Sequence, residues 1–150
     1  VLLGDDIIDA EIPCIRQMIE VHEKYHGSVV AIMEVPKDEV SRYGIVDGIL
    51  LPDTDGRVFQ VHNMVEKPKI EDSPSNLAII GRYLLTPAIF DVLETTGRGS
   101  GGEIQLTDAL QRLLHKEPIF AYKFRGKRYD AGEKRFRGLR AGERVSNEFA

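Results

Sequence analysis

The sequence has no tryptophan and a single cysteine, Cys14, among its 150 residues. One cysteine excludes a disulfide within the chain and favours a reducing compartment, so we expect a cytoplasmic location. No apolar run approaches the roughly 20 residues that span a bilayer. No basic segment followed by an apolar one marks a secretory leader either. We therefore expect no membrane partner.

Basic residues are also in the minority, with 20 Lys and Arg against 24 Asp and Glu and a net charge of −4. This balance gives no sign of a nucleic-acid partner, since such proteins usually carry a basic surface, and we expect none. A phosphate site in this chain would have to be basic locally. Hydrophobic residues make up 42% and charged residues 29%, which is ordinary for a globular domain long enough to bury a core.

The order of β-branched runs and amphipathic segments predicts an α/β domain. A Pro-Asp-Thr-Asp-Gly turn at 52–56 joins two strand-like runs into a hairpin. Alternating strands and helices around this hairpin predict one domain, 1–150, whose mixed sheet has flanking helices and a central β-hairpin. We expect strands at 1–3, 28–35, 44–51, 57–66, 77–85 and 119–124, helices at 11–25, 87–93, 106–115 and from 133, and a turn at 129–132.

The first residues form an apolar run that ends at Gly4-Asp5-Asp6. Ligands of open α/β sheets lie beyond the carboxyl ends of strands, where a carboxylate such as Asp5 can hold Mg²⁺ against phosphate oxygens. A helix cap or a solvated turn is the alternative. Because the chain starts within an apparent strand and without methionine, we expect a preceding part to be missing and the domain to be incomplete and marginally stable.

An acid and a base, Glu66 and Lys67, follow an apolar run that Pro68 ends. The carboxylate suits sugar hydroxyls and the ammonium suits a phosphate, but a solvated ion pair is an alternative. Gly44 opens another strand, where the missing side chain lets a ligand approach the backbone, unless it is an ordinary turn glycine.

Two further groups are ambiguous. Thr107 and Asp108 follow a glycine-rich stretch, and either residue can cap the helix there, while Asp108 can also serve as a second metal carboxylate. A basic cluster lies near Asp130 and either neutralises phosphates or forms a solvated strand edge. The cluster consists of Lys123, Arg125, Lys127 and Arg128.

Taken together, these segments resemble the bacterial UTP–glucose-1-phosphate uridylyltransferases over about residues 1–134. They agree in order and in spacing. The resemblance implies a partial Rossmann-like nucleotide-diphospho-sugar transferase fold that acts on UTP and glucose 1-phosphate with Mg²⁺. The products would be UDP-glucose and pyrophosphate. The matching segments are Leu3–Asp6, Arg42–Val46, Val65–Pro68, Ser75–Tyr83, Gly102–Ala109 and Gly126–Asp130.

The resemblance also implies roles for single residues. Asp5 would hold Mg²⁺ with help from Asp108, and Glu66 would accept hydrogen bonds from glucose. Lys67 would be the catalytic cation that pairs with the sugar phosphate. The remaining substrate-binding residues would be Gly44 and Gly81, which let the backbone lie against the sugar, and Asp130.

Two departures from the family pattern limit the prediction. The glycine-rich loop with an arginine and a lysine, which holds the nucleotide, has no counterpart, so we expect the sugar-phosphate half of a site and little activity alone. The family usually continues with an apolar helix used in subunit packing, which implies a homo-oligomer, but the tail at 135–150 is arginine-rich and divergent.

Three alternatives stay open: a thymidylyltransferase-like or other sugar-phosphate nucleotidyltransferase, a metal-dependent glycosyltransferase, and a non-catalytic sugar-phosphate-binding remnant. Asp5-Asp6 lacks the Asp-x-Asp spacing of such a glycosyltransferase.

Overall fold

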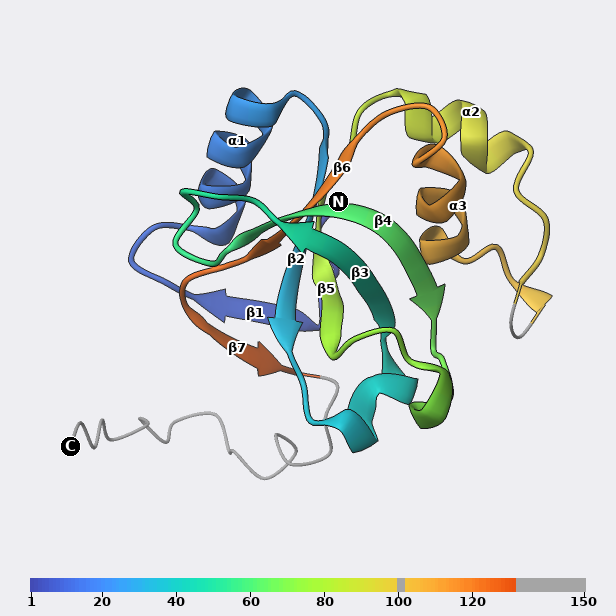
Figure 1. Cartoon of the computed structure of the whole chain (residues 1–150), viewed down its shortest axis with the longest axis horizontal. Coiled ribbons are helices and arrows are strands. Elements are labelled where there is room, and N and C mark those ends of the chain that lie inside the picture. Colours follow the sequence, from blue (N-terminus) through green and yellow to red (C-terminus); the bar gives the residue numbers. More distant parts are fainter. Residues whose placement is uncertain (100–101, 132–150) are drawn as a thin grey trace.

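The structure, a computed structural model, describes residues 1–99 and 102–131 (Figure 1). The strands expected between 28 and 124 and the first three expected helices are present, together with two short 3₁₀ helices, whereas the strands at 6–9 and 127–130 were not expected. The strands are β1 (Asp6–Asp9), β2 (Ser28–Glu34), β3 (Gly44–Leu50), β4 (Val58–Glu66), β5 (Leu77–Leu84), β6 (Ile119–Lys123) and β7 (Lys127–Asp130). The helices are α1 (Cys14–Tyr25), η1 (Lys37–Arg42), η2 (Ile70–Asp72), α2 (Ala88–Glu94) and α3 (Leu106–Leu113).

Five strands form a closed hydrogen-bonded ring in the order β2-β5-β3-β4-β6. The β2–β6 pair is parallel and the other pairs are antiparallel, so the sheet is mixed. The β3–β4 hairpin is the central antiparallel pair, and helices flank the sheet (Figure 1). The predicted α/β class, with its mixed sheet and central hairpin, is confirmed.

The core is divided by the sheet, and β2 shows how. Val30 and Ile32 pack in one apolar cluster with α2 and α3, while Val29 and Ala31 pack in another with α1. This alternation is the two-residue period of a strand buried on both faces. Burial of each such large apolar side chain stabilises the fold by roughly 2 kcal/mol. The helices therefore fix the sheet from opposite sides, as Figure 1 shows.

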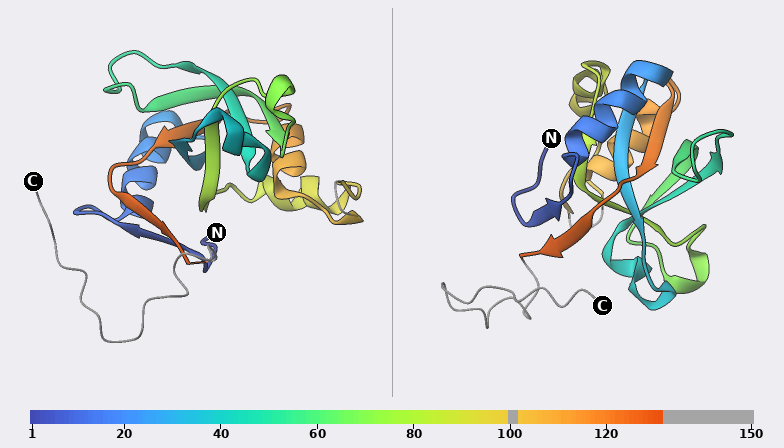
Figure 2. Two further views of the ribbon diagram at one scale, coloured as in Figure 1. Left: turned by 90° about the horizontal axis from the view of Figure 1, so that it is seen from below. Right: turned by 90° about the vertical axis from the view of Figure 1, so that its left-hand side faces the viewer.

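A two-stranded ribbon of β1 and β7 lies apart from the barrel (Figures 1 and 2). Its register places Asp6 opposite Asp130 and Ile7 opposite Tyr129. The expected turn at 129–132 is therefore wrong over Tyr129 and Asp130, which belong to β7. Local sequence could not indicate this strand, because its only partner lies more than a hundred residues earlier.

The first three residues also differ from expectation. Val1 and Leu2 are 62% and 60% exposed, and Leu2 forms an antiparallel bridge with Arg82 of β5. The amide of Leu3 donates to the carbonyl of Gly81 at 2.8 Å. A buried parallel strand was expected here, and that was wrong, because the neighbour among the described residues is β5, which runs in the opposite direction.

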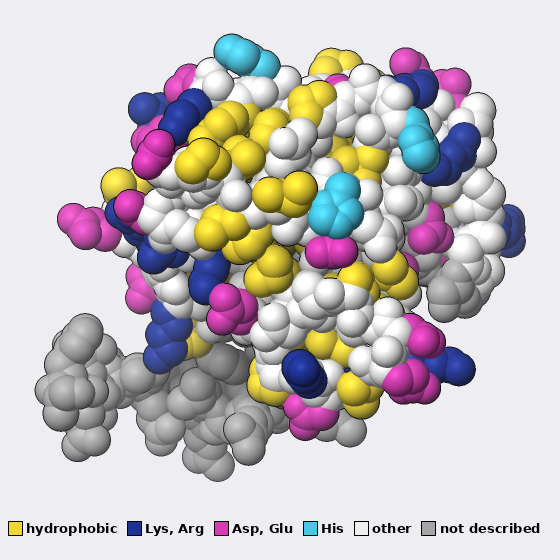
Figure 3. Space-filling view, in the orientation of Figure 1, with side chains coloured by type: hydrophobic (Ala, Val, Ile, Leu, Met, Phe, Trp, Pro, Cys, Tyr) yellow, Lys and Arg dark blue, Asp and Glu magenta, His cyan; other side chains and the backbone are white. Residues whose placement is uncertain are grey.

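The surface shows how the remaining side chains are distributed. On the face seen in Figure 3, apolar side chains gather in a broad patch and most charged side chains lie around its edge. Within the described residues, no helix combines the length and apolar character needed to cross a membrane. The helix expected from 133 and the divergent tail at 135–150 lie outside the described residues.

Candidate functional site

A pocket of about 370 Å³ opens where the ends of several strands meet. It is lined by segments from five strands and from α3, which are distant in sequence. Asp108 is not among the lining residues. The pocket brings together six of the seven residues predicted from the sequence: Asp5, Gly44, Glu66, Lys67, Gly81 and Asp130.

The pairing of β3 with β4 sets one wall of the pocket. Gly44, the first residue of β3, lies opposite Glu66, the last residue of β4. The amide of Lys67 donates to the carbonyl of Tyr43 at 3.0 Å, which extends the hairpin by one bond. Lys67 has a φ of 44°, a left-handed backbone that costs a non-glycine residue about 1 kcal/mol. The chain therefore turns sharply just beyond Glu66.

Glu66 is nearly buried yet free to accept hydrogen bonds. Its side chain is 14% exposed, and its nearest cation is the Lys67 ammonium, 3.9 Å from Oε1. No hydrogen bond to its carboxylate forms from any residue that the structure describes. Buried carboxylates normally accept hydrogen bonds. A carboxylate at a pocket wall that accepts none is available to a hydrogen-bond donor of a ligand.

Lys67 completes this wall from the mouth of the pocket. Its side chain is 55% exposed, so the ammonium can move toward a bound anion without losing a buried contact. At 3.9 Å its link to Glu66 is a weak ion pair rather than a hydrogen bond. The pair therefore offers one acceptor inside and one cation at the rim.

Another part of the pocket lining is organised by Arg128. Its guanidinium donates to the buried carboxylate of Asp6 and, at 3.1 Å, to Asp130, and it lies 5.7 Å from the centre of the Tyr43 ring. Burial disfavours the charge, but the hydrogen bond to Asp6 and its negative charge outweigh that effect and raise the pKa of Arg128. Of the predicted basic cluster, Arg128 is thus fixed inside the pocket as the counter-ion of Asp6.

The two neighbouring aspartates divide into separate roles. Asp6 is buried, and besides Arg128 it accepts the amide of Gly81 at 2.9 Å, so its carboxylate is already neutralised. Asp5 is exposed and lines the pocket, with its carbonyl accepting the amide of Ala131 at 2.8 Å. The sequence singled out Asp5, while the buried contribution of Asp6 was missed because it depends on its contact with Arg128, 122 residues away.

Asp5 and Asp130 present two carboxylates at one rim of the pocket. The side chain of Asp130 is 21% exposed, and Asp130 lies opposite Asp6 in the β1–β7 ribbon, one residue before Ala131, whose amide donates to the carbonyl of Asp5. Mg²⁺ usually takes one or two protein carboxylates and fills the remaining positions with phosphate and water, so this pair fits the ion. Among the described residues, no three His, Cys, Asp or Glu side chains are grouped to hold a metal alone. Asp108 instead lies against Gly99.

The two predicted glycines have different neighbours. A Cβ on Gly44 would lie 2.7 Å from Thr107 Oγ1 and 3.1 Å from Glu66 Oε2, so the missing side chain there makes room for these two oxygens. A Cβ on Gly81 would lie 2.6 Å from Asp6 Oδ2, so the missing side chain there makes room for Asp6. Each glycine thus lets polar groups that line the pocket come close to the backbone.

Tyr83 and Thr107 are among the lining residues that sequence reasoning missed. Tyr83 is buried, and burial, followed by the charges of Glu66 and Asp6, raises its pKa to about 12. Thr107 was considered only as a helix cap, but Gln105 occupies the cap position of α3 and Thr107 is buried against the pocket. Both residues lie in segments that match the family, Ser75–Tyr83 and Gly102–Ala109, and this match was the sequence feature that could have indicated them.

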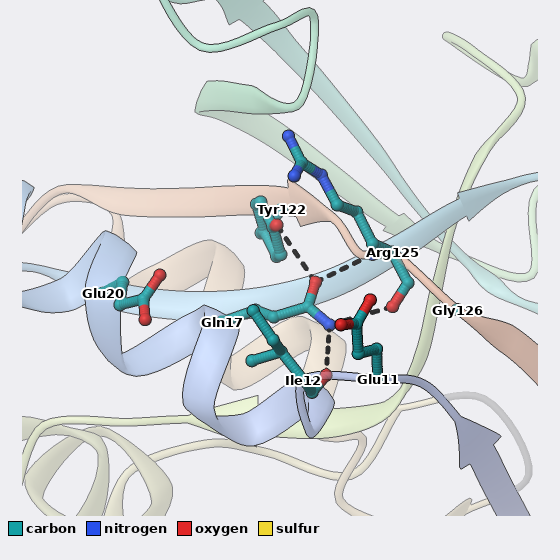
Figure 4. Close-up of a pocket in the computed structure, with 7 residues that line it drawn as sticks. All are labelled: Glu11, Ile12, Gln17, Glu20, Tyr122, Arg125 and Gly126. Atoms are coloured by element: carbon teal, nitrogen blue, oxygen red, sulfur yellow. Dashed lines mark hydrogen bonds between the residues drawn. The ribbon is translucent and has the colours of Figure 1, made fainter.

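A second pocket of about 390 Å³ lies between α1 and the turn from β6 to β7 (Figure 4). Gln17 is at its centre, and its amide nitrogen donates to the carbonyls of Ile12 and Arg125 at 2.6 and 2.9 Å. Its amide oxygen accepts from the Tyr122 hydroxyl at 3.1 Å and the Arg125 amide at 2.8 Å. Because the Gln17 amide is already saturated by the protein, this pocket is a weaker candidate for a functional site.

Residues 1–135 match the sequence model of a family described as Nucleotidyl transferase. The UTP--glucose-1-phosphate uridylyltransferase of Bacillus subtilis is 53% identical over 134 residues, which are 89% of this chain and 45% of the relative. The enzyme of the same name from Staphylococcus haemolyticus is 52% identical, with 89% of this chain and 46% of the relative covered. The chain thus spans about half the length of these curated relatives.

Solved structures agree with these sequence relatives. A crystal structure of a UDP-glucose pyrophosphorylase complexed with UDP-glucose has a TM-score of 0.82 and 47% identity, covering 89% of this chain and 50% of that chain. A UTP-bound UGPase from Acinetobacter baumannii has a TM-score of 0.75 and 34% identity, covering 89% of this chain and 46% of that chain.

Proposed function

Because the chain belongs to the nucleotidyl transferase family, we propose that it forms the sugar-phosphate side of a UTP–glucose-1-phosphate uridylyltransferase. The observation that carries this proposal is the carboxylate of Glu66, which is nearly buried beside Gly44 and accepts no hydrogen bond from any described residue. A neutral polyol has hydroxyl donors for such a group. Curated relatives of this name at 52–53% identity support the choice of substrate.

The pocket separates the two ends of a sugar phosphate. Glu66 and the backbone at Gly44 receive the hydroxyls of glucose, and Lys67 at the mouth pairs with the phosphate. An ammonium suits the phosphate as a compact point charge, because it can follow the anion as the charge moves during reaction. The sugar phosphate is thereby held with its phosphate toward the mouth, where a nucleotide must approach.

The proposed reaction is an in-line displacement. A phosphate oxygen of glucose 1-phosphate forms a new bond to the α-phosphorus of UTP, and the bond from that phosphorus to the bridging oxygen of pyrophosphate breaks. The products are UDP-glucose and pyrophosphate. The chain's contribution is to hold the nucleophile in position and to offset its charge, which is how most of the catalysis in such transfers arises.

Mg²⁺ fits the rim formed by Asp5 and Asp130. Bound there, the ion would offset negative charge on the phosphate oxygens that meet at the reaction centre. Arg128 neutralises Asp6 and also donates to Asp130 at 3.1 Å, whereas Asp5 is exposed. Asp130 then takes the place that the sequence suggested for Asp108.

The activity is tested by complementation. The 150-residue chain is mixed with the part of the Bacillus subtilis relative that it does not match, and UDP-glucose formation and pyrophosphate release are measured with UTP, dTTP and other nucleotides. We expect turnover with UTP and glucose 1-phosphate in the mixture and little with the chain alone. A clear preference for dTTP would support the thymidylyltransferase alternative. Glucose 1-phosphate binding without any turnover would support the non-catalytic one.

A cytoplasmic location and a homo-oligomeric whole protein are parts of the same proposal. The single cysteine supports the first, and the resemblance supports the second. Light scattering after size exclusion of the complemented protein checks the second, and a monomeric mass for an active complex would contradict it.

A further inference from the structure

Thr107 lines the pocket, and its hydroxyl has no hydrogen-bond partner among the described residues. It stands in the first turn of α3, and its side chain is buried. Gln105 occupies the cap position, and no side-chain capping bond forms there. The Thr107 hydroxyl makes no hydrogen bond within the part of the chain that the structure describes. Among the described residues, no fully buried side-chain oxygen or nitrogen lacks a hydrogen-bond partner, so this unbonded hydroxyl opens onto the pocket that Thr107 lines and is available to a ligand there.

The hydroxyl of Thr107 and the carboxylate of Glu66 converge over Gly44. The point where a Cβ of residue 44 would stand is 2.7 Å from Thr107 Oγ1 and 3.1 Å from Glu66 Oε2. These two oxygens are not hydrogen-bonded to each other. The two oxygens therefore lie within about 6 Å of each other beside Gly44, close enough for one ligand hydroxyl to contact both, and α3 holds one oxygen while β4 holds the other.

The chemistry of the pair selects a hydroxyl group. An ionised carboxylate only accepts hydrogen bonds, whereas the hydroxyl of threonine can donate one. A ligand hydroxyl between them gives its proton to Glu66 and accepts the proton of Thr107. An ether oxygen or a methylene cannot satisfy both groups. Threonine is also stiff at χ1, which holds the donor in place.

We propose that Thr107 is a specificity-determining residue that contacts the same sugar hydroxyl as Glu66. This inference rests on the proposed function, because it takes a sugar phosphate as the ligand of the pocket. In this proposal one hydroxyl of the sugar ring contacts both Thr107 and Glu66. A sugar that lacks this hydroxyl would leave both side chains without a hydrogen-bond partner in a nearly buried place. Sites built to hydrogen-bond a hydroxyl discriminate strongly against analogues without it.

The test compares binding of glucose 1-phosphate and its four monodeoxy analogues, modified at carbon 2, 3, 4 or 6. Calorimetry is done on the 150-residue chain and on Thr107→Val and Thr107→Ser. We expect Thr107→Val to weaken glucose 1-phosphate about fivefold, the effect of one hydrogen bond, and Thr107→Ser to keep most of the affinity. One analogue, and only one, should bind Thr107→Val as tightly as it binds the unmodified chain, because it lacks the hydroxyl that Thr107 contacts.

The matched control is Thr96→Val. Thr96 is also buried, but its hydroxyl donates to the carbonyl of Val92 at 2.7 Å and accepts from Arg112 at 3.0 Å, away from the pocket. This variant should be less stable and bind glucose 1-phosphate as the unmodified chain does.

The outcomes separate the two claims. Equal affinity of Thr107→Val and the unmodified chain, or an equal loss with all four analogues, overturns the role of Thr107 while leaving the proposed function in place. Failure of the unmodified, folded chain to bind glucose 1-phosphate at all overturns the proposed function, and the role of Thr107 falls with it.

Discussion

Two hollows of similar size, about 390 Å³ beside α1 and about 370 Å³ at the strand ends, use their polar groups in opposite ways. In the first, the amide nitrogen of Gln17 donates two hydrogen bonds to protein groups and its oxygen accepts two from them. In the second, Glu66 and Thr107 have no hydrogen-bond partner among the described residues. The first pocket stabilises the fold, while the second keeps binding capacity for a ligand.

The contrast extends to the cations of the second pocket. Arg128 is buried and bound to Asp6, so it belongs to the structure of the wall. Lys67 is mostly exposed and only weakly paired, so it is available to an anion. Pairing within the protein therefore separates the residues that build the site from those that would act on a ligand.

The largest expected effect is on stability, from Gln17→Ala. This change leaves the Tyr122 hydroxyl and buried backbone groups of the β6–β7 turn without partners, so the free energy of unfolding should fall by about 3 kcal/mol. Urea unfolding measures it. Glu20→Ala, at an exposed position of the same helix, should change stability by less than about 0.5 kcal/mol. Equal losses in the two variants would contradict a structural role for the Gln17 network.

Glu66→Gln should weaken ligand binding without lowering stability. It removes the charge that accepts from the sugar, and affinity for glucose 1-phosphate should drop roughly thirtyfold, about 2 kcal/mol, with stability unchanged or higher. Calorimetry and urea unfolding check the two parts. Glu94→Gln, at an exposed position at the end of α2, is the control and should alter neither. A marked loss of stability in Glu66→Gln with intact binding would mean that the carboxylate is structural.

Alkaline pH should lower the free energy of unfolding through one group in each region, over different pH ranges. Burial raises the pKa of Cys14, on the α1 side, from 9.0 to about 11, against the opposing charge of Arg82. The folded chain thus keeps a proton that the unfolded chain loses, so this stability is complete below pH 9 and declines as pH rises toward 11, by about 2 kcal/mol. Tyr83 lines the candidate site, and burial raises its pKa from 10.0 to about 12. Its contribution to stability is therefore complete below pH 10 and declines as the pH rises toward 12.

Two variants separate these windows. In urea unfolding at a series of pH values, Cys14→Ala should flatten the decline between pH 9 and 11, and Tyr83→Phe should flatten the decline above pH 10. If the pH dependence of Cys14→Ala matched that of the unmodified chain, the thiol would not be the group responsible.

The smallest expected effect is that of Lys67→Gln. Since the ammonium is 55% exposed, its attraction for a phosphate is screened by water, and affinity for glucose 1-phosphate should fall about fivefold, less at high salt. Lys69→Gln, at an exposed position two residues on, is the matched control. A loss that does not depend on salt, or an equal loss in the control, would argue against a direct contact with the phosphate.

The elements of the barrel and the three α-helices could be predicted because their signals are local. The β-branched run at 28–35 became β2, and the turn at 52–56 joins β3 to β4. The β1–β7 ribbon and the exposure of Val1 could not be predicted, since both depend on which distant strand is available as a partner. Ring closure likewise depends on pairing of β2 with β6, which no local pattern specifies.

The candidate site was predictable to the extent that a resemblance identified its segments. Glu66, Lys67 and Gly44 were found in this way, and the structure brings them to one pocket. The pairing of Asp6 with Arg128 and the place of Thr107 were not predictable, because they depend on three-dimensional contacts between segments up to 122 residues apart.

The central claim is that the pocket at the strand ends binds a sugar phosphate and the pocket beside α1 does not. The most direct measurement is an amide-resolved NMR titration of the 150-residue chain with glucose 1-phosphate. We predict saturable shifts at Gly44, Glu66, Lys67 and Thr107, and none at Gln17. The absence of saturable shifts, or shifts confined to the neighbourhood of Gln17, would contradict the claim.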